Sequence, residues 1–314
     1  MRLVDSSQPD NAKSKRSLGR SVVRIGGTIL ALVAIAYVGR AIVQNEIWAS
    51  GSTTLSQILA IAVVGGGVYA AINIFLSAGW WQNLVQQNVD TSFTDSHRIY
   101  SRSQIAKYVP GNVLHYGSRH VLGTMAGIGQ GKLIAGAALE ANRMIVAAVL
   151  LSAFGLENWA DAVGFPAGFI VAVGAVAVAA SVVIDGVLIR RFKKISLQIW
   201  LASVTGMAAV VGLYGGFFAI CGLILWAITW VVLGQPGGLT IAAAMGAYAT
   251  AWVVGFVVPG ASAGIGVREA VMIFGLAGLV GTPEAIVIAL LMRVATVVGD
   301  VLFFASAQLT RKPA

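Results

Sequence analysis

The hydrophobic positions of the chain fall in long runs that short polar segments separate. A helix of about 20 apolar residues spans the hydrocarbon core of a bilayer, so each run predicts a transmembrane helix. Single spans are expected at residues 21–44, 55–80, 133–156, 163–189, 240–257 and 284–309. The longer run 196–234 is expected to cross twice, with a turn at Gly212, Gly215 and Gly216. The pattern predicts an all-α polytopic membrane protein with about eight transmembrane helices.

Two shorter segments, 110–131 and 259–281, each begin with Pro-Gly and repeat at a constant offset of 149 residues (from 110 to 259, and from 119 to 268). Their matching glycines and prolines are Pro110, Gly111 and Gly117 in the first copy, and Pro259, Gly260 and Gly266 in the second. Arg119 and Arg268 follow at the same distance. Helix breakers at corresponding places in two halves indicate a transporter's binding site. We therefore expect two re-entrant half-helix hairpins, whose irregular backbone needs protein or a water-filled cavity around it.

Lysine and arginine positions set the expected orientation, because cytoplasmic loops are rich in them. Residues 1–20 form a basic cytoplasmic tail, and 21–314 form one membrane domain with repeat elements around 97–156 and 240–309. Basic residues also cluster at 98–107, at 190–194 and at the C-terminus, whereas the loops near Glu46 and Glu157 lack them. The sequence predicts a multi-pass inner (plasma) membrane protein with both termini cytoplasmic. The first hairpin then enters from the cytoplasm and the second from outside, as an inverted repeat.

The polar segment 81–107 predicts an interfacial helix that leads into the first hairpin, capped by Thr94, Asp95 or Ser96. An ordinary polar loop is the alternative.

Composition narrows the function. With 58% hydrophobic and 11% charged residues and a mean hydropathy of +0.84, the chain is far too apolar for a soluble enzyme. The net charge of +9 comes from basic residues beside apolar runs, so it indicates anionic lipid headgroups and no nucleic acid. The single cysteine, Cys221, and three unclustered histidines predict no metal site. The glycine-rich segment 126–133 lacks the first glycine and the Ser/Thr of a phosphate loop, so we expect no cofactor.

Charged residues inside apolar runs are the candidate functional groups, because each costs about 2.5–3.5 kcal/mol at mid-membrane. Helical spacing predicts pairing of Glu140 with Arg143 and of Arg293 with Asp300. Such pairs form a polar pathway, or they only lock helices together. Asp185 is expected to be a solvated end residue.

Two separated motifs resemble the transmembrane region of the lysylphosphatidylglycerol synthase family. Lys107-Tyr108-Val109-Pro110-Gly111 is similar to that family's KY-(L/I/V)-PG signature. Pro259-Gly260, followed by Gly264-Ile265-Gly266-Val267-Arg268-Glu269, is similar to its PG…GxGxRE signature. The resemblance implies a flippase-like domain that moves a lipid between leaflets, aminoacylated phosphatidylglycerol in the best-known members. The aminoacyl-transferase domain of those members is absent from this sequence, which implies a stand-alone member acting on a glycolipid or polyprenyl-linked sugar.

We therefore expect translocation of an amphipathic lipid with an anionic phosphate headgroup, by a transporter and not an enzyme. Arg119 and Arg268 would bind the phosphate, because an arginine beside a half-helix N-terminus suits an anion. Lys107, Tyr108 and Glu269 complete the expected substrate site, and Glu140, Arg143, Arg293 and Asp300 form the expected polar pathway. Candidate partners are membrane lipids, glycosyltransferases and other envelope-lipid enzymes. The alternatives are a membrane-embedded transferase acting on lipid-linked sugars and a non-transporting scaffold.

Overall fold

The fold is helical throughout the part of the chain that the structure, a computed structural model, describes: residues 53–108, 114–155, 167–190, 197–235, 237–258 and 266–309. Every regular element in these ranges is a helix, which confirms the all-α class. The expected span 21–44 lies outside the described residues. So do Pro110, Gly111, Pro259 and Gly260, the Pro-Gly pairs of the two repeated motifs.

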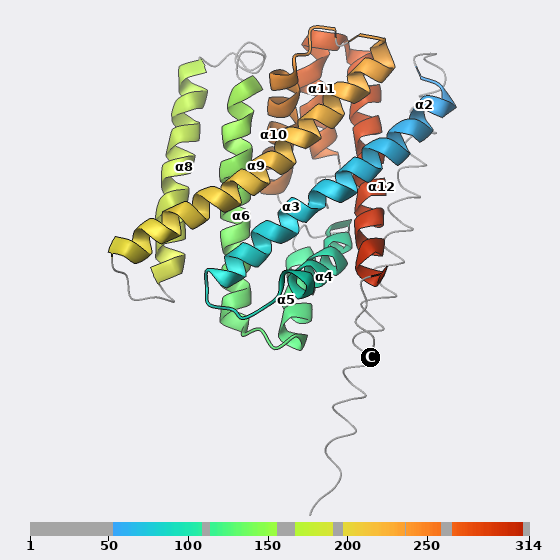
Figure 1. The fold of residues 1–314 in the computed structure, drawn as a ribbon. Coiled ribbons are helices and arrows are strands. Elements are labelled where there is room, and N and C mark those ends of the chain that lie inside the picture. The colour runs from blue at the N-terminus through green and yellow to red at the C-terminus, as the bar shows by residue number, and fades with distance from the viewer. Residues whose placement is uncertain are drawn as a thin grey trace, which may run out of the picture.

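Four helices among the described residues are long and apolar enough to cross a membrane (Figure 1). The first is a continuous run of α2 (Leu55–Ala60), the π-helical turn η1 (Ile61–Gly65) and α3 (Gly66–Val85). The others are α6 (Gln130–Ser152), α9 (Leu197–Leu233) and α12 (Thr282–Leu309). They confirm the spans expected at 55–80, 133–156 and 284–309. A fifth helix, α8 (Ala167–Arg190), covers the span expected at 163–189.

The expectation that residues 196–234 cross twice is wrong. They form one helix, α9, of 37 residues, and Gly212, Gly215 and Gly216 lie inside it without a turn. A glycine costs a helix only about 1 kcal/mol relative to alanine. A turn in apolar surroundings would expose several backbone groups without water to bind them, which costs far more. At 1.5 Å per residue α9 is about 55 Å long, and it lies strongly tilted across the bundle (Figure 1).

The helices that flank the repeated motifs are short. On the first side these are α4 (Phe93–Gln104), the 3-10 turn η2 (Ile105–Tyr108) and α5 (Leu114–Met125). On the second side they are α10 (Ile241–Val257) and α11 (Val267–Val280). With 12 and 14 residues, α5 and α11 reach about 18 and 21 Å, less than the roughly 30 Å core. In Figure 1, α4 and α5 lie at the lower end of the bundle, whereas α10 and α11 lie in its upper part.

The helix expected in the segment 81–107 is α4, although its N-cap is Ser92 and not one of the three predicted residues. The Ser92 hydroxyl accepts a hydrogen bond from the backbone N–H of Asp95 at 3.1 Å. On the next turn His97 lies 3.0 Å from the Ser77 hydroxyl of α3, and its ring packs on Phe303 of α12. Burial, together with the neighbouring Arg98, lowers the pKa of His97, so α4 is held to the bundle by a neutral imidazole.

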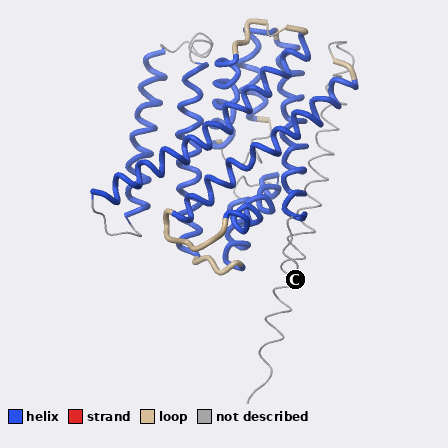
Figure 2. Tube along the Cα trace, viewed as in Figure 1, coloured by secondary structure: helices blue, strands red, loops and turns tan. Residues whose placement is uncertain are grey.

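Each of the two short-helix groups packs against a pair of long helices, and the contacts in the two groups correspond. Helix α3 packs on α12, as α9 packs on α6. Helix α4 contacts α3 and α12, as α10 contacts α9 and α6. Helix α8 lies at the edge, mainly against α6. The tube view in Figure 2 shows that loops join these helices at the two ends of the bundle.

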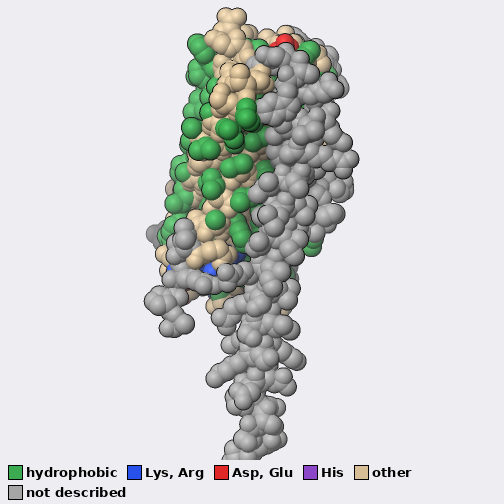
Figure 3. Space-filling view, turned by 90° about the vertical axis from the view of Figure 1, so that its right-hand side faces the viewer, with side chains coloured by type: hydrophobic (Ala, Val, Ile, Leu, Met, Phe, Trp, Pro, Cys, Tyr) green, Lys and Arg blue, Asp and Glu red, His purple; other side chains and the backbone are tan. Residues whose placement is uncertain are grey.

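The outer face of the bundle is apolar. Figure 3 shows hydrophobic side chains over the middle of one face, with Lys and Arg near its lower end and an acidic side chain near its upper end. Valines on η1 and α8, such as Val63, Val64, Val176 and Val183, are at least 65% exposed. Such a surface fits lipid contact, and together with the four long apolar helices it indicates a membrane protein.

Candidate functional site

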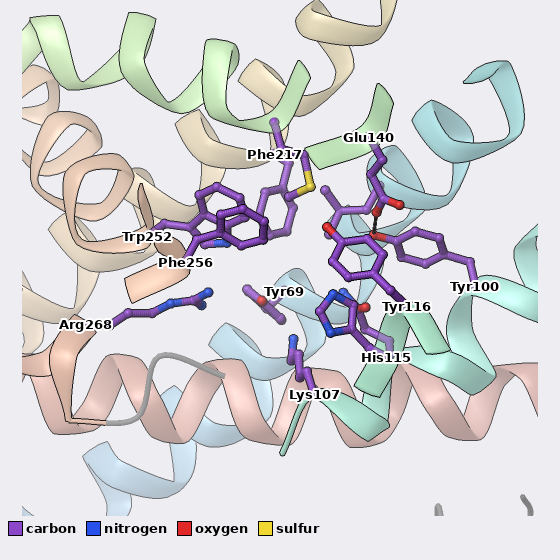
Figure 4. Close-up of a pocket in the computed structure, with 13 residues that line it drawn as sticks. Tyr69, Tyr100, Lys107, His115, Tyr116, Glu140, Phe217, Trp252, Phe256 and Arg268 are labelled. Atoms are coloured by element: carbon purple, nitrogen blue, oxygen red, sulfur yellow. Dashed lines mark hydrogen bonds between the residues drawn. The ribbon is translucent and has the colours of Figure 1, made fainter. Parts of the chain in front are cut away.

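A cavity inside the bundle is lined by residues of both short-helix groups and of the long helices α3, α6 and α9 (Figure 4). It holds about 50 Å³ of space open to water, several times the roughly 10–15 Å³ that one water needs. Its polar lining comes from both repeated regions, with Lys107 on η2, His115 on α5 and Arg268 on α11. The rest of the lining comprises Tyr69, Leu76, Tyr100, Gln104, Tyr116, Glu140, Met144, Phe217, Trp252 and Phe256.

Lys107 and Tyr108, from the first signature, both contact Asp300 on α12. The Lys107 ammonium lies 2.7 Å from one carboxylate oxygen of Asp300 and 2.8 Å from the other. The Tyr108 hydroxyl donates to the same carboxylate at 2.6 Å. Asp300 is 1% exposed, so a lone negative charge there would be costly. The contacts neutralise it and tie the end of η2 to α12.

Arg119 lies on α5 and forms a buried ion pair with Glu140 of α6. Its Nε donates to the Ser103 hydroxyl at 3.1 Å, and its guanidinium lies 3.8 Å from the centre of the Tyr100 ring. The Tyr100 hydroxyl in turn donates to Glu140 at 2.9 Å. Arg119 is therefore held in place on several sides by side chains of α4 and α6.

Arg268 occupies the equivalent position on α11, but no carboxylate pairs with it among the described residues. Its guanidinium lies 5.7 Å from the centre of the Trp252 ring and points into the cavity (Figure 4). Gly255 makes room for the side chain, because a Cβ there would lie 2.5 Å from Cγ of Arg268. The neighbouring Glu269 has other partners. It accepts from the backbone N–H of Gly266 at 2.6 Å and lies 3.4 Å from Nε of Arg293.

The structure describes two glycines of the repeated motifs, Gly117 and Gly266, and their positions relative to a helix differ. Gly266 has φ +82°, a conformation that other residues rarely adopt, and it is the N-cap of α11, so this helix begins directly after it. Gly117 lies within α5 and is not among the described glycines with positive φ, so the expectation that it breaks a helix is wrong.

The ion pairs expected from helical spacing are also wrong. Arg143 does not pair with Glu140. Its Nη2 lies 2.6 Å from a carboxylate oxygen of Asp185 on α8, and Nη1 donates to Asn83 of α3. Asp185, expected to be solvated, is 2% exposed and also accepts from Asn142. Likewise Arg293 pairs with Glu269, and Asp300 with Lys107. Each carboxylate finds its cation on another helix, because buried charges pair with whichever group the packing brings nearest.

Three residues that line the cavity carry polar atoms without a hydrogen-bond partner: Oε1 of Gln104, Nδ1 of His115 and Nε of Arg268. Nη2 of Arg119 also lacks one, but Arg119 does not line the cavity itself and contacts the lining residues Tyr100 and Glu140. Gln104 is only 7% exposed. Since buried polar atoms are nearly always hydrogen-bonded, unpartnered ones in a cavity indicate a ligand or water. Neither Gln104 nor His115 was predicted from the sequence as a site residue, although both lie within seven residues of the first Pro-Gly pair.

Among the described residues, no three His, Cys, Asp or Glu side chains come close enough together to hold a metal ion. No protein-family model and no curated protein matches the chain.

Proposed function

We propose that the protein translocates a lipid with an anionic phosphate headgroup between membrane leaflets. The observation that carries the proposal is the central cavity, into which Arg268 points without a carboxylate partner among the described residues. The four described carboxylates of the interior each pair with a cation: Glu140 with Arg119, Asp185 with Arg143, Glu269 with Arg293 and Asp300 with Lys107. A bound phosphate would neutralise the remaining charge.

A difference between the two copies of the repeated motif explains why Arg268 has no carboxylate partner among the described residues. A shift of 149 residues carries Arg119 onto Arg268, but it carries Glu140 onto Ala289. Ala289 is fully buried and offers no charge. Two equivalent arginines therefore differ, one neutralised within the protein and one open to the cavity. In membrane proteins an intramembrane charge without a partner is a functional group by default.

The same shift supports an inverted repeat with two re-entrant hairpins. It carries α4, α5 and α6 onto α10, α11 and α12, and α3 onto the second half of α9. Helix contacts follow the equivalence, since α3 with α12 corresponds to α9 with α6, and α4 with α12 corresponds to α10 with α6. In this proposal α10 is the first arm of the second hairpin and not a separate span. The two hairpins would reach the cavity from opposite leaflets (Figure 1).

Roles for the other charged groups follow from their positions. We propose that Lys107 and Tyr108 guide the headgroup in from the cytoplasmic leaflet, and that their contact with Asp300 opens when it enters. Arg119 would add its unpartnered Nη2 to the phosphate site while Glu140 holds it. Glu269 and Arg293 would form the opposite side of the pathway, where a second small pocket lies between them and Arg268. The proposal includes a plasma membrane location with cytoplasmic termini, and kinship with the flippase-like family that the two motifs resemble.

A reconstitution experiment tests the function. Purified protein in liposomes should move a fluorescent anionic phospholipid from the inner to the outer leaflet, which dithionite quenching measures, and mass spectrometry should find the lipid unchanged. Arg268→Gln should lose most of this activity. Arg98→Gln is the matched control, because Arg98 pairs with Asp95 on α4, away from the cavity. Absence of movement with folded protein, or a chemically modified headgroup, would contradict the proposal.

A further inference from the structure

We infer that the cavity selects phosphate headgroups that carry hydroxyl groups and no amine: a single polyol or sugar phosphate. The inference rests on the proposed function and narrows its substrate class. Three properties of the cavity support it, namely its charge, its unpartnered hydrogen-bonding atoms and its aromatic lining.

The charge of the lining excludes a cationic amine. Lys107 and Arg268 both point into the space shown in Figure 4. A headgroup ammonium would need a carboxylate to neutralise its charge, but the nearby carboxylates are already engaged. Glu140 accepts from Arg119 and Tyr100, and Asp300 accepts from Lys107 and Tyr108. An amine in this cavity would lie near Arg268, the lining cation without a carboxylate partner among the described residues, in a medium of low dielectric constant, where the repulsion is strong.

The unpartnered atoms of the cavity need hydrogen-bond partners that a ligand with hydroxyl groups as well as a phosphate supplies. Nε of Arg268 is a donor, which a phosphate oxygen satisfies. Oε1 of Gln104 is an acceptor and needs a donor from the ligand. A phosphodiester has no proton to give, and an amine is excluded by charge. A hydroxyl can donate to Gln104 without adding charge, and it can also pair with Nδ1 of His115 in either tautomer.

The aromatic lining suits a compact ring. Trp252 and Phe256 stack with their planes 8° apart and their centroids 5.0 Å apart, beside the Arg268 guanidinium. Tyr69, Tyr100, Tyr116 and Phe217 complete the wall. Largely apolar walls with a few placed polar groups are typical of small-molecule sites. The cavity is small, with about 50 Å³ of space open to water, so a compact headgroup suits it better than a chain of sugars.

Competitive lipid binding tests the inference. Detergent-solubilised protein would be mixed with equal amounts of four lipids of distinct mass, and native mass spectrometry would measure the bound fraction of each. Phosphatidylinositol supplies a polyol phosphate, phosphatidylmethanol a phosphate without hydroxyls, phosphatidylethanolamine a neutral amine headgroup and lysylphosphatidylglycerol a cationic one. We expect phosphatidylinositol to bind at least 10-fold more tightly than either amine lipid, and several-fold more tightly than phosphatidylmethanol.

Variants separate the two parts of the site. Gln104→Met removes the acceptor at similar volume, so it should abolish the preference for phosphatidylinositol over phosphatidylmethanol and leave phosphatidylmethanol binding unchanged. His115→Phe serves the same purpose if Gln104→Met does not fold. Arg268→Gln should weaken both lipids about equally.

The outcomes distinguish the inference from the proposed function. Amine lipids that bind or move as well as phosphatidylinositol would overturn the inference and leave the translocation proposal standing. Equal binding of phosphatidylmethanol and phosphatidylinositol would also overturn it, because the hydroxyl requirement would be lost. Binding and movement of none of the four lipids by folded protein would overturn the proposed function itself.

Discussion

Arg119 and Arg268 occupy equivalent positions after two similar motifs, but the contacts of their guanidinium groups differ. Arg119 is 2% exposed and is fixed by Glu140, Ser103 and the face of Tyr100. Arg268 lies over Trp252 and contacts no carboxylate in the described part of the chain. We therefore expect the first arginine to stabilise the fold more than the second, and we propose the second as the ligand for an incoming anion.

Substitution should separate these two tasks. Arg119→Gln leaves Glu140 buried and charged, so it should reduce the free energy of unfolding by about 3–5 kcal/mol, and adding Glu140→Gln should restore most of it. Arg268→Gln should keep wild-type thermal stability but weaken phosphatidylinositol binding about 10- to 100-fold, because a charge-assisted hydrogen bond contributes about 1.5–3 kcal/mol. Thermal unfolding in detergent and lipid titration measure both effects. Equal loss of stability in the two single variants would contradict the distinction.

At the scale of elements, α8 depends on one buried cluster for its attachment. The helix packs mainly on α6, where Arg143 contacts Asp185 through Nε and Nη2 and reaches Asn83 of α3 through Nη1. Asn142 also donates to the α8 backbone at Ser181. Because lipid on the outer face of α8 is as apolar as the helix itself, the hydrophobic effect contributes little to this contact. The polar cluster therefore fixes the position of α8.

Breaking that cluster should loosen α8 specifically. Asp185→Ala leaves the Arg143 guanidinium buried without its carboxylate partner, so the free energy of unfolding should fall by about 3–5 kcal/mol. The double variant Arg143→Met with Asp185→Leu should recover most of this loss, since apolar residues of similar volume can replace a buried ion pair. Val183→Ala, on the exposed face of α8, is the control and should change little. Wild-type stability of Asp185→Ala would show that the pair does not hold the helix.

At the scale of the whole molecule, two short-helix groups from opposite ends of the bundle contribute to one cavity. Lys107 joins the first group to α12 through Asp300, and Arg268 comes from the second group. The loops at 86–92 and 126–129 lie at the lower end in Figure 1, and the loops at 234–240 and near 281 lie at the upper end. Our proposal places these two ends on opposite sides of the membrane.

Cysteine labelling in intact cells tests that placement. Cys221 is fully buried, so it should give little background, and Cys221→Ala removes it altogether. In that variant a membrane-impermeant maleimide should label cysteines placed at exposed Gln235 and Thr282 from outside. Cysteines placed at exposed Asp90 and Ala126 should react only after the membrane is permeabilised. Labelling of all four positions from one side would exclude hairpins that open to opposite leaflets.

The sequence by itself determined the features that depend on neighbours along the chain. Run length and hydropathy predicted the helices at 55–80, 133–156 and 284–309, because a bilayer fixes how many apolar residues a span needs. The sequence singled out Gly266, and its positive φ at the N-cap of α11 is one that glycine adopts readily. It also singled out Arg268, as a charge after the second Pro-Gly pair, and Lys107, from the first signature motif, and both line the cavity.

Only the tertiary structure decided which distant groups meet. Helical spacing placed Glu140 beside Arg143, but packing supplied each with a partner from another helix. It also buried Asp185 and brought Gln104 to the cavity, and no local pattern contains that information. Glycines in 212–216 suggested a turn because their intrinsic helix propensity is low. The surrounding helices kept α9 continuous, since its backbone hydrogen bonds have no replacement in an apolar environment.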